Sequence, residues 1–175
     1  MAIPGMRGSD HIGLTVPDLD VADDFLVNVL GATRVLEQPG FRDEDGDTMA
    51  VQLGVPARAG IRRFNFYRMG YGTNYEVFEY DVADQAQQVP LNSDVGGHHI
   101  GIYVDDIDAA VAYLRDKGVD VMGQIVPSGG GSAGNRWIYF RAPWGLQFEL
   151  VSFPEGKAYE QDAPVLLWNA ASPAQ

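Results

Sequence analysis

The chain of 175 residues contains no cysteine. This absence excludes disulfide bonds, thiolate metal ligands and a cysteine nucleophile, and it fits a reducing compartment, so we expect a cytoplasmic protein. The opening segment MAIPGMRGSD lacks the basic start and apolar run of a signal peptide. No stretch approaches the roughly 18 apolar residues of a membrane span, so we expect no membrane association.

Basic residues are also scarce, with 12 Lys and Arg against 24 Asp and Glu and a net charge of -12. An acidic protein repels phosphate backbones, so nucleic acid is not an expected partner. Hydrophobic residues make up 46% and charged residues 21% of the chain, which predicts a globular fold. The length suits one domain or two small halves that share a core.

Histidine occurs only three times. His98 and His99 are adjacent in the segment GGHHIGIYVDDID, and His11 stands in the similar segment SDHIGLTVPDLD. Residues 11–26 match residues 99–114 at a constant offset of 88, which places His99 on His11 and His98 on Asp10. The overlay therefore favours His99 over His98 as the equivalent of His11.

A second pair of segments supports an internal duplication. Residues 63–77 match residues 136–150 at an offset of 73, and this match pairs Glu76 with Glu149. Both blocks occur in the same order in each half, which chance similarity of β-rich segments does not explain. The two offsets differ by 15 residues, and we expect this surplus of the first half in two turn-rich segments, residues 37–48 and 54–60.

Each half has the residue pattern of a β-α-β-β-β module. In the first half the pattern predicts a strand over 11–16, a helix from 17 or 18 to Gly31, and strands around 50–53, 62–67 and 74–80. In the second half it predicts a strand over 99–104, a helix over 105–118, and strands around 121–126, 136–140 and 146–153. We expect an α+β fold with a first module at 8–80, a linker at 81–95, a second module at 96–153 and a C-terminal extension at 154–175.

Strand parity places the chemistry-bearing side chains. Alternate side chains of a strand point to opposite faces, so His11 and Thr15 should point away from the helix, as should His99 and Tyr103. Glu76 and Glu149 lie between apolar neighbours in strands, where a carboxylate needs a cation partner.

If the halves pair about a pseudo-twofold axis, His11, Glu76, His99 and Glu149 converge. Two imidazoles and two carboxylates suit Zn, Ni, Co, Mn or Fe(II) without selecting among them. Glu79 is a second acidic residue in the same strand as Glu76, and only the gapless repeat match favours Glu76.

The segments HIGLTVPDLDVADDFLVNVLGA, GGHHIGIYVDDIDAAVAYLRDKG and RAPWGLQFELV resemble the vicinal oxygen chelate superfamily, which includes glyoxalase I, methylmalonyl-CoA epimerase, extradiol dioxygenases and bleomycin-resistance proteins. The resemblance covers roughly residues 8–153. It implies two paired modules that form a curved sheet around a central cleft with a divalent metal. The ligand positions of the family fall on His11, Glu76, His99 and Glu149.

The resemblance implies a lyase or isomerase of the glyoxalase or epimerase type. Such an enzyme chelates a small substrate through neighbouring oxygens and stabilises an enediolate, with Glu149 or Glu76 as the base. Tyr103 and Thr15 either contact the substrate or only line the pocket. Two alternatives stay open, an Fe(II) extradiol-type dioxygenase and a metal-free protein that binds an aromatic compound. We expect a homodimer, in which the site lies within one chain or across two.

Overall fold

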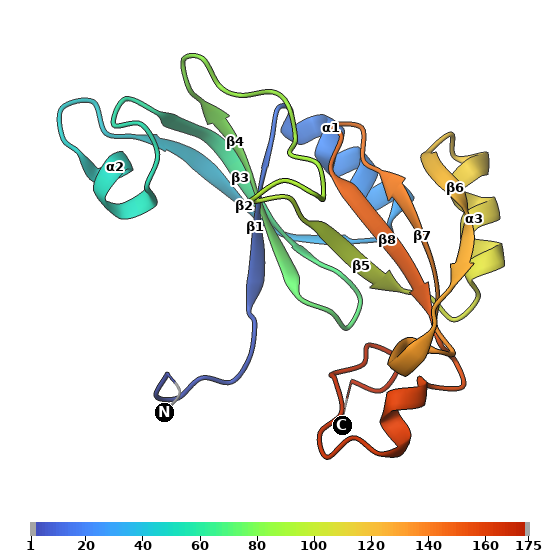
Figure 1. Cartoon of the computed structure of the whole chain (residues 1–175). Coiled ribbons are helices and arrows are strands. Elements are labelled where there is room, and N and C mark those ends of the chain that lie inside the picture. Colours follow the sequence, from blue (N-terminus) through green and yellow to red (C-terminus); the bar gives the residue numbers. More distant parts are fainter. Residues whose placement is uncertain (1–2, 174–175) are drawn as a thin grey trace. The chain divides into compact units, whose positions relative to one another are not determined.

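The computed structural model describes residues 3–173, which fold into two compact units that meet in sequence between Gln87 and Gln88. This boundary lies within the predicted linker. In the first unit the elements are β1 (His11–Val16), α1 (Leu19–Asp24), the π-helical segment η1 (Phe25–Val29), β2 (Thr33–Arg42), α2 (Thr48–Leu53), β3 (Gly60–Arg68) and β4 (Asn74–Asp81). Its four strands form one sheet in the order β1-β4-β3-β2 (Figure 1).

The second unit has the same topology. Its elements are β5 (His99–Tyr103), α3 (Ile107–Asp116), β6 (Asp120–Pro127), the short 3₁₀ helix η2 (Gly130–Ser132), β7 (Arg136–Arg141), β8 (Gln147–Ser152) and a second 3₁₀ helix, η3 (Ala158–Gln161). The sheet order is β5-β8-β7-β6, with β5 parallel to β8 as β1 is to β4. The α+β class and the two β-α-β-β-β modules are therefore confirmed.

Each sheet buries one face under its own helix. In the first unit Leu14 and Val16 of β1 are buried, while Gly13 and Thr15 are exposed. In the second unit Ile100 of β5 is buried between exposed neighbours. The alternation confirms the predicted parity, which leaves both histidines on the face away from the helix.

The first helix begins as predicted but changes its winding. The Asp18 carboxylate accepts hydrogen bonds from the backbone N–H groups of Asp20 and Val21, which caps α1. After Asp24 the backbone becomes π-helical, and the N–H of Leu30 donates to the carbonyl of Phe25. The helix then ends at Gly31, whose φ of 76° suits glycine best. The π turn is a local widening of one helix, which side-chain periodicity does not reveal.

The prediction of a strand around residues 50–53 was wrong, because this segment is helix α2. The Asp43 carboxylate accepts hydrogen bonds from the N–H groups of Gly46 and Thr48, which stabilises the start of that helix. Gly54, with a φ of 66°, closes it. The second strand of the module is instead β2, which pairs with β3 at the edge of the sheet and so tolerates Pro39.

Most of the surplus of the first half lies around α2, between the end of β2 and the start of β3, which includes parts of both predicted insertions. In the second half the structure confirms the helix and all of the predicted strands. The extension after β8 contains η3, and its last two residues lie outside the described part of the chain. In that described part, every helix is too short or too polar to cross a membrane.

Candidate functional site: two matched His–Glu pairs

The first unit brings His11 and Glu76 together. β1 and β4 are parallel neighbours, and their register sets Gly13 beside Glu76. His11 Nε2 lies 3.2 Å from Glu76 Oε2. The side chains keep 40% and 18% of their surface exposed, so a ligand can reach both.

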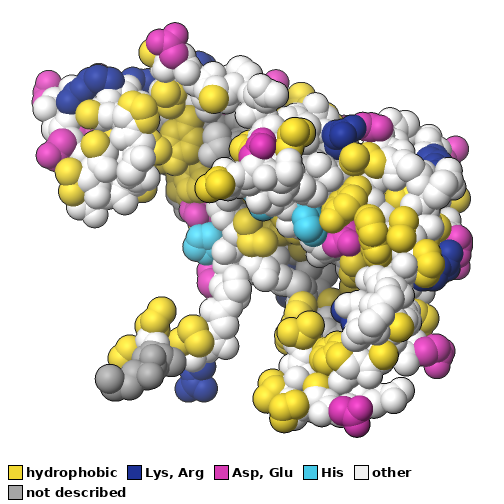
Figure 2. Space-filling view, viewed as in Figure 1, with side chains coloured by type: hydrophobic (Ala, Val, Ile, Leu, Met, Phe, Trp, Pro, Cys, Tyr) yellow, Lys and Arg dark blue, Asp and Glu magenta, His cyan; other side chains and the backbone are white. Residues whose placement is uncertain are grey.

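The second unit repeats this arrangement with His99 and Glu149. β5 and β8 are parallel, Gly101 lies beside Glu149, and His99 Nε2 is 3.3 Å from Glu149 Oε2. A Cβ atom on Gly101 would lie 3.6 Å from the same carboxylate oxygen, so glycine keeps the approach to it open. Figure 2 shows histidine side chains at the surface with acidic side chains beside them.

The environment shifts the pKa of His11 and the pKa of Glu149. The hydrogen bond to Asp10 raises the pKa of His11 above its usual value, and the charge of Glu76 acts in the same direction. Burial raises the pKa of Glu149, and the neighbouring His99 partly offsets that rise. The two units therefore share one geometry but differ in electrostatics.

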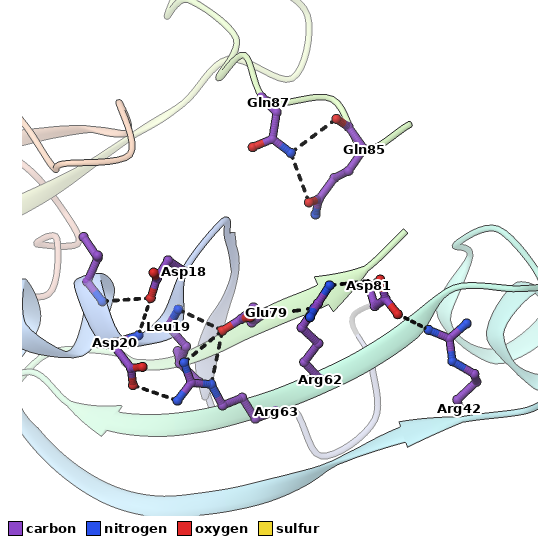
Figure 3. A network of polar contacts seen from close by, with 11 residues as sticks. Asp18, Leu19, Asp20, Arg42, Arg62, Arg63, Glu79, Asp81, Gln85 and Gln87 are labelled. Atoms are coloured by element: carbon purple, nitrogen blue, oxygen red, sulfur yellow. Dashed lines mark hydrogen bonds and ion pairs between the residues drawn. The ribbon is translucent and has the colours of Figure 1, made fainter. Parts of the chain in front are cut away.

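Glu79, the alternative to Glu76, points to the opposite face of β4. Its carboxylate accepts hydrogen bonds from the backbone N–H of Leu19 and from the Arg63 guanidinium, each at 3.1 Å (Figure 3). Glu79 thus joins the start of α1 to the sheet. Of the two acids, Glu76 is the one that lies beside a histidine.

Two further identities of the internal repeat are ion pairs between helix and sheet. Arg63 donates to Asp20 at 2.7 Å in the first unit, and Arg136 donates to the equivalent Asp108 at 2.7 Å in the second. Both pairs join the helix of a module to its third strand. These matched residues therefore serve the fold of each module.

Aromatic side chains flank both pairs. Phe66 lies directly across from Glu76 on β3, and its ring meets the His11 ring edge-on at 6.2 Å. Tyr139 lies directly across from Glu149 on β7 and meets the His99 ring edge-on at 5.0 Å. The sequence repeat had aligned these two positions as one aromatic pair, but only the strand pairing shows that they adjoin the candidate ligands.

The predicted substrate-contact residues lie on the same faces. Thr15 is exposed on β1, two positions beyond Gly13. Tyr103 is partly buried at the end of β5, where its ring packs edge-on against Phe153 at 4.9 Å. Thr15 therefore has an open side chain, whereas Tyr103 also packs against the end of the second module.

Each pair offers two donor atoms that one divalent cation could bind. Bonds near 2.0–2.2 Å from one cation to an imidazole nitrogen and a carboxylate oxygen leave those atoms about 3 Å apart, close to the separations found here. The donors are the nitrogen and oxygen types that Zn, Ni, Co, Mn and Fe accept. Within residues 3–173, neither unit alone gathers three or more acidic or histidine side chains as a metal site. Each unit supplies two candidate ligands.

Comparisons with known proteins agree with this architecture. Residues 10–140 match the family model described as the Glyoxalase/Bleomycin resistance protein/Dioxygenase superfamily. A 2-epi-5-epi-valiolone epimerase from Actinomyces sp is 45% identical over 169 residues, which cover 95% of this chain and 91% of that protein.

Solved structures share the fold at low sequence identity. A glyoxalase family protein from Bacillus cereus is 19% identical with a TM-score of 0.63, covering 86% of this chain and 98% of that one. A variant of the fosfomycin resistance protein FosX from Listeria monocytogenes, complexed with Mn(II) and 1S,2S-dihydroxypropylphosphonic acid, is 20% identical with a TM-score of 0.53. The match covers 83% of this chain and 89% of FosX. The chain therefore belongs to the glyoxalase/bleomycin resistance/dioxygenase superfamily, as its repeated His and Glu segments predicted.

Proposed function

We propose that this protein is a divalent-metal-dependent epimerase of a small hydroxylated ketone of the 2-epi-5-epi-valiolone type. The observation that carries the proposal is the His–Glu pair that both units present on the face away from the helix. The substrate class comes from the epimerase that is 45% identical over nearly the whole chain, and its name denotes a hydroxylated ketone. The same relative favours an isomerase over an extradiol dioxygenase or a metal-free binding protein.

The proposed site joins both pairs, so that His11, Glu76, His99 and Glu149 hold one divalent metal. The matched geometry of the pairs supports this, as does the Mn(II) in FosX, which has the same fold. When bound, the metal would supply Lewis-acid stabilisation of negative charge that develops on the substrate carbonyl oxygen.

Epimerisation next to a carbonyl needs a base and a proton donor. The C–H bond breaks, its proton passes to a carboxylate, and its electron pair enters the C=C bond of an enediolate. Return of a proton to the opposite face inverts the stereocentre. Glu149 and Glu76 are the candidates for both tasks, because both carboxylates stay partly exposed beside the histidines. Thr15 and Tyr103 are candidates for orienting the substrate hydroxyl groups.

The first experiment measures metal content and proton exchange. We expect the metal-loaded protein to exchange the hydrogen at the inverted carbon of 2-epi-5-epi-valiolone with deuterium from D₂O, as followed by NMR. His11→Ala and His99→Ala should each lose metal and exchange, whereas His98→Ala should keep both because its imidazole faces Gly96. Unchanged metal content in both ligand variants would overturn the metal site. Full metal content with no exchange in the wild-type protein would overturn the substrate assignment alone.

If the protein is a homodimer, as expected, the two pairs of one site come either from one chain or from two. If the site takes its pairs from two different chains, mixing inactive His11→Ala with inactive His99→Ala chains forms hybrids that have one intact site. Activity then returns on mixing. If both pairs come from one chain, the mixture stays inactive, and sedimentation of the same samples reports whether a dimer forms.

A further inference from the structure

The His11 imidazole touches a carboxylate at each ring nitrogen. Its Nε2 faces Glu76 at 3.2 Å, and its Nδ1 lies 2.8 Å from Asp10 Oδ2 on the other side of the ring. Asp10 cannot share a cation with Nε2 from that side. Its contact therefore acts on the orientation of the ring.

Asp10 is itself tied to the strand that carries Glu76. The backbone N–H and the side-chain amide of Asn74 both donate to the Asp10 carbonyl, at 3.3 and 3.1 Å. Asn74 is the first residue of β4 and precedes Glu76 by two positions. Strand β4 therefore carries the candidate ligand Glu76 and, through Asn74, fixes the backbone of Asp10.

The second unit lacks this contact. His98 occupies the position equivalent to Asp10, and its Nδ1 lies 3.1 Å from the carbonyl oxygen of Gly96. Among residues 3–173, no hydrogen-bond partner meets His99 Nδ1. The two imidazoles thus face their glutamates in the same way, but only His11 has a carboxylate at Nδ1.

Resting on the metal site proposed above, we propose that Asp10 is a positioning residue, which orients His11 for a divalent cation and has no counterpart in the second unit. When Nδ1–H donates to the Asp10 carboxylate, the lone pair of the ring lies on Nε2, on the side of Glu76. The contact also makes the imidazole a stronger ligand. The imidazole of the first unit is thereby oriented for metal binding, whereas that of the second unit lacks this contact.

Affinity for Mn²⁺ at one fixed pH, measured from the EPR signal of free Mn²⁺, tests this role. Loss of such a contact commonly weakens metal binding 10- to 100-fold, and we expect about tenfold for Asp10→Ala because the carboxylate is largely exposed. Asp10→Asn keeps an acceptor for Nδ1–H and should recover part of that loss. His98→Ala is the matched control at the equivalent position and should bind Mn²⁺ within about twofold of wild type.

Ring-¹⁵N NMR of the metal-free proteins provides a second readout, since only three histidines contribute signals. Asp10→Ala should shift the His11 Nδ1 signal and leave that of His99 in place. Wild-type affinity in a folded Asp10→Ala protein, or equal losses in Asp10→Ala and His98→Ala, would overturn the positioning role. A wild-type protein that binds none of Mn²⁺, Zn²⁺, Ni²⁺, Co²⁺ and Fe²⁺ would overturn the metal site and this role together, whereas tight binding without epimerisation would overturn only the substrate.

Discussion

Glu76 and Glu79 lie three residues apart on β4 and point to opposite faces of the sheet. Glu76 meets the imidazole of His11, and Glu79 meets the guanidinium of Arg63 and the first turn of α1. One strand thus carries two acids, of which one faces the candidate site and the other joins the helix to the sheet.

This division predicts that the same substitution, Glu to Gln, affects metal binding at position 76 and stability at position 79. Glu76→Gln should weaken metal binding and activity strongly, because a neutral amide is a poor partner for a cation, and it should leave stability nearly unchanged. Glu79→Gln should keep the metal but lower the free energy of unfolding by about 1–2 kcal/mol, since it weakens charge-assisted hydrogen bonds. Metal analysis and urea unfolding of both variants provide the check. Equal metal loss in both would contradict the assignment.

The two His–Glu pairs also differ in the aromatic side chain beside them. Tyr139 in the second unit takes the place that Phe66 has in the first, beside the candidate ligands. Within the described chain, the Tyr139 hydroxyl has no hydrogen-bond partner and is free to donate to a substrate oxygen. We expect Tyr139→Phe to lower kcat/KM for the ketone about tenfold, the value of one hydrogen bond, with metal content unchanged. The reverse change, Phe66→Tyr, should cause no such loss, and equal kcat/KM values in wild type and Tyr139→Phe would remove the hydroxyl from the reaction.

The fold could be predicted wherever the repeat supplied a second copy. Alternation in β1 and β5 gave the buried face, and the gapless match gave the strands with Glu76 and Glu149. The region from β2 to α2 has no close copy in the second half, and Pro39-Gly40 is typical of a turn. Pairing with β3 decides the course of β2, and it depends on residues distant in the sequence. The start of α2 is set by hydrogen bonds from the N–H groups of Gly46 and Thr48 to the nearby Asp43 carboxylate, which hydrophobic periodicity does not reveal.

The candidate site shows the same limit. Its four proposed ligands were named from repetition and parity, because both are periodic properties of the chain. Asp10 was missed because the overlay sets it against an unrelated residue, His98. Phe66 and Tyr139 were aligned but received no role, since their place beside the glutamates follows from antiparallel pairing that sequence periodicity does not specify.

The contact between α1 and β3 predicts that removing the hydroxyl group costs more stability at Tyr67 than at Tyr75, although both tyrosines are buried. The hydroxyl of Tyr67 donates to Asp23 at 2.8 Å and accepts from the buried amide of Asn65 at 3.1 Å. Tyr67→Phe leaves that amide without its partner and should lower the free energy of unfolding by about 1–3 kcal/mol. Tyr75 is similarly buried, but its hydroxyl has no hydrogen-bond partner in the described part of the chain, so Tyr75→Phe should be nearly neutral. Urea unfolding compares the two, and equal costs would contradict the role of the Tyr67 hydroxyl.

The cap of α2 predicts a pH-dependent contribution to stability. The Thr48 hydroxyl and the N–H groups of Gly46 and Thr48 lower the pKa of Asp43 from 3.8 to about 2. A carboxyl whose pKa is lower in the folded state stabilises the fold fully above its unfolded pKa and loses that effect as the pH falls toward the folded value. Wild type should therefore exceed Asp43→Ala in unfolding free energy by a constant amount above about pH 5, and the difference should shrink between pH 4 and pH 2.

Asp47→Ala is the matched control in the same turn. Asp47 directly precedes α2, but its side chain makes no capping hydrogen bond. Its replacement should leave the wild-type pH dependence in place, because the bonds that lower the pKa all belong to Asp43. Urea unfolding across this pH range, with circular dichroism as the signal, compares the three proteins. A difference between wild type and Asp43→Ala that grows as the pH falls would contradict the cap, because it would require the folded state to favour the protonated carboxyl.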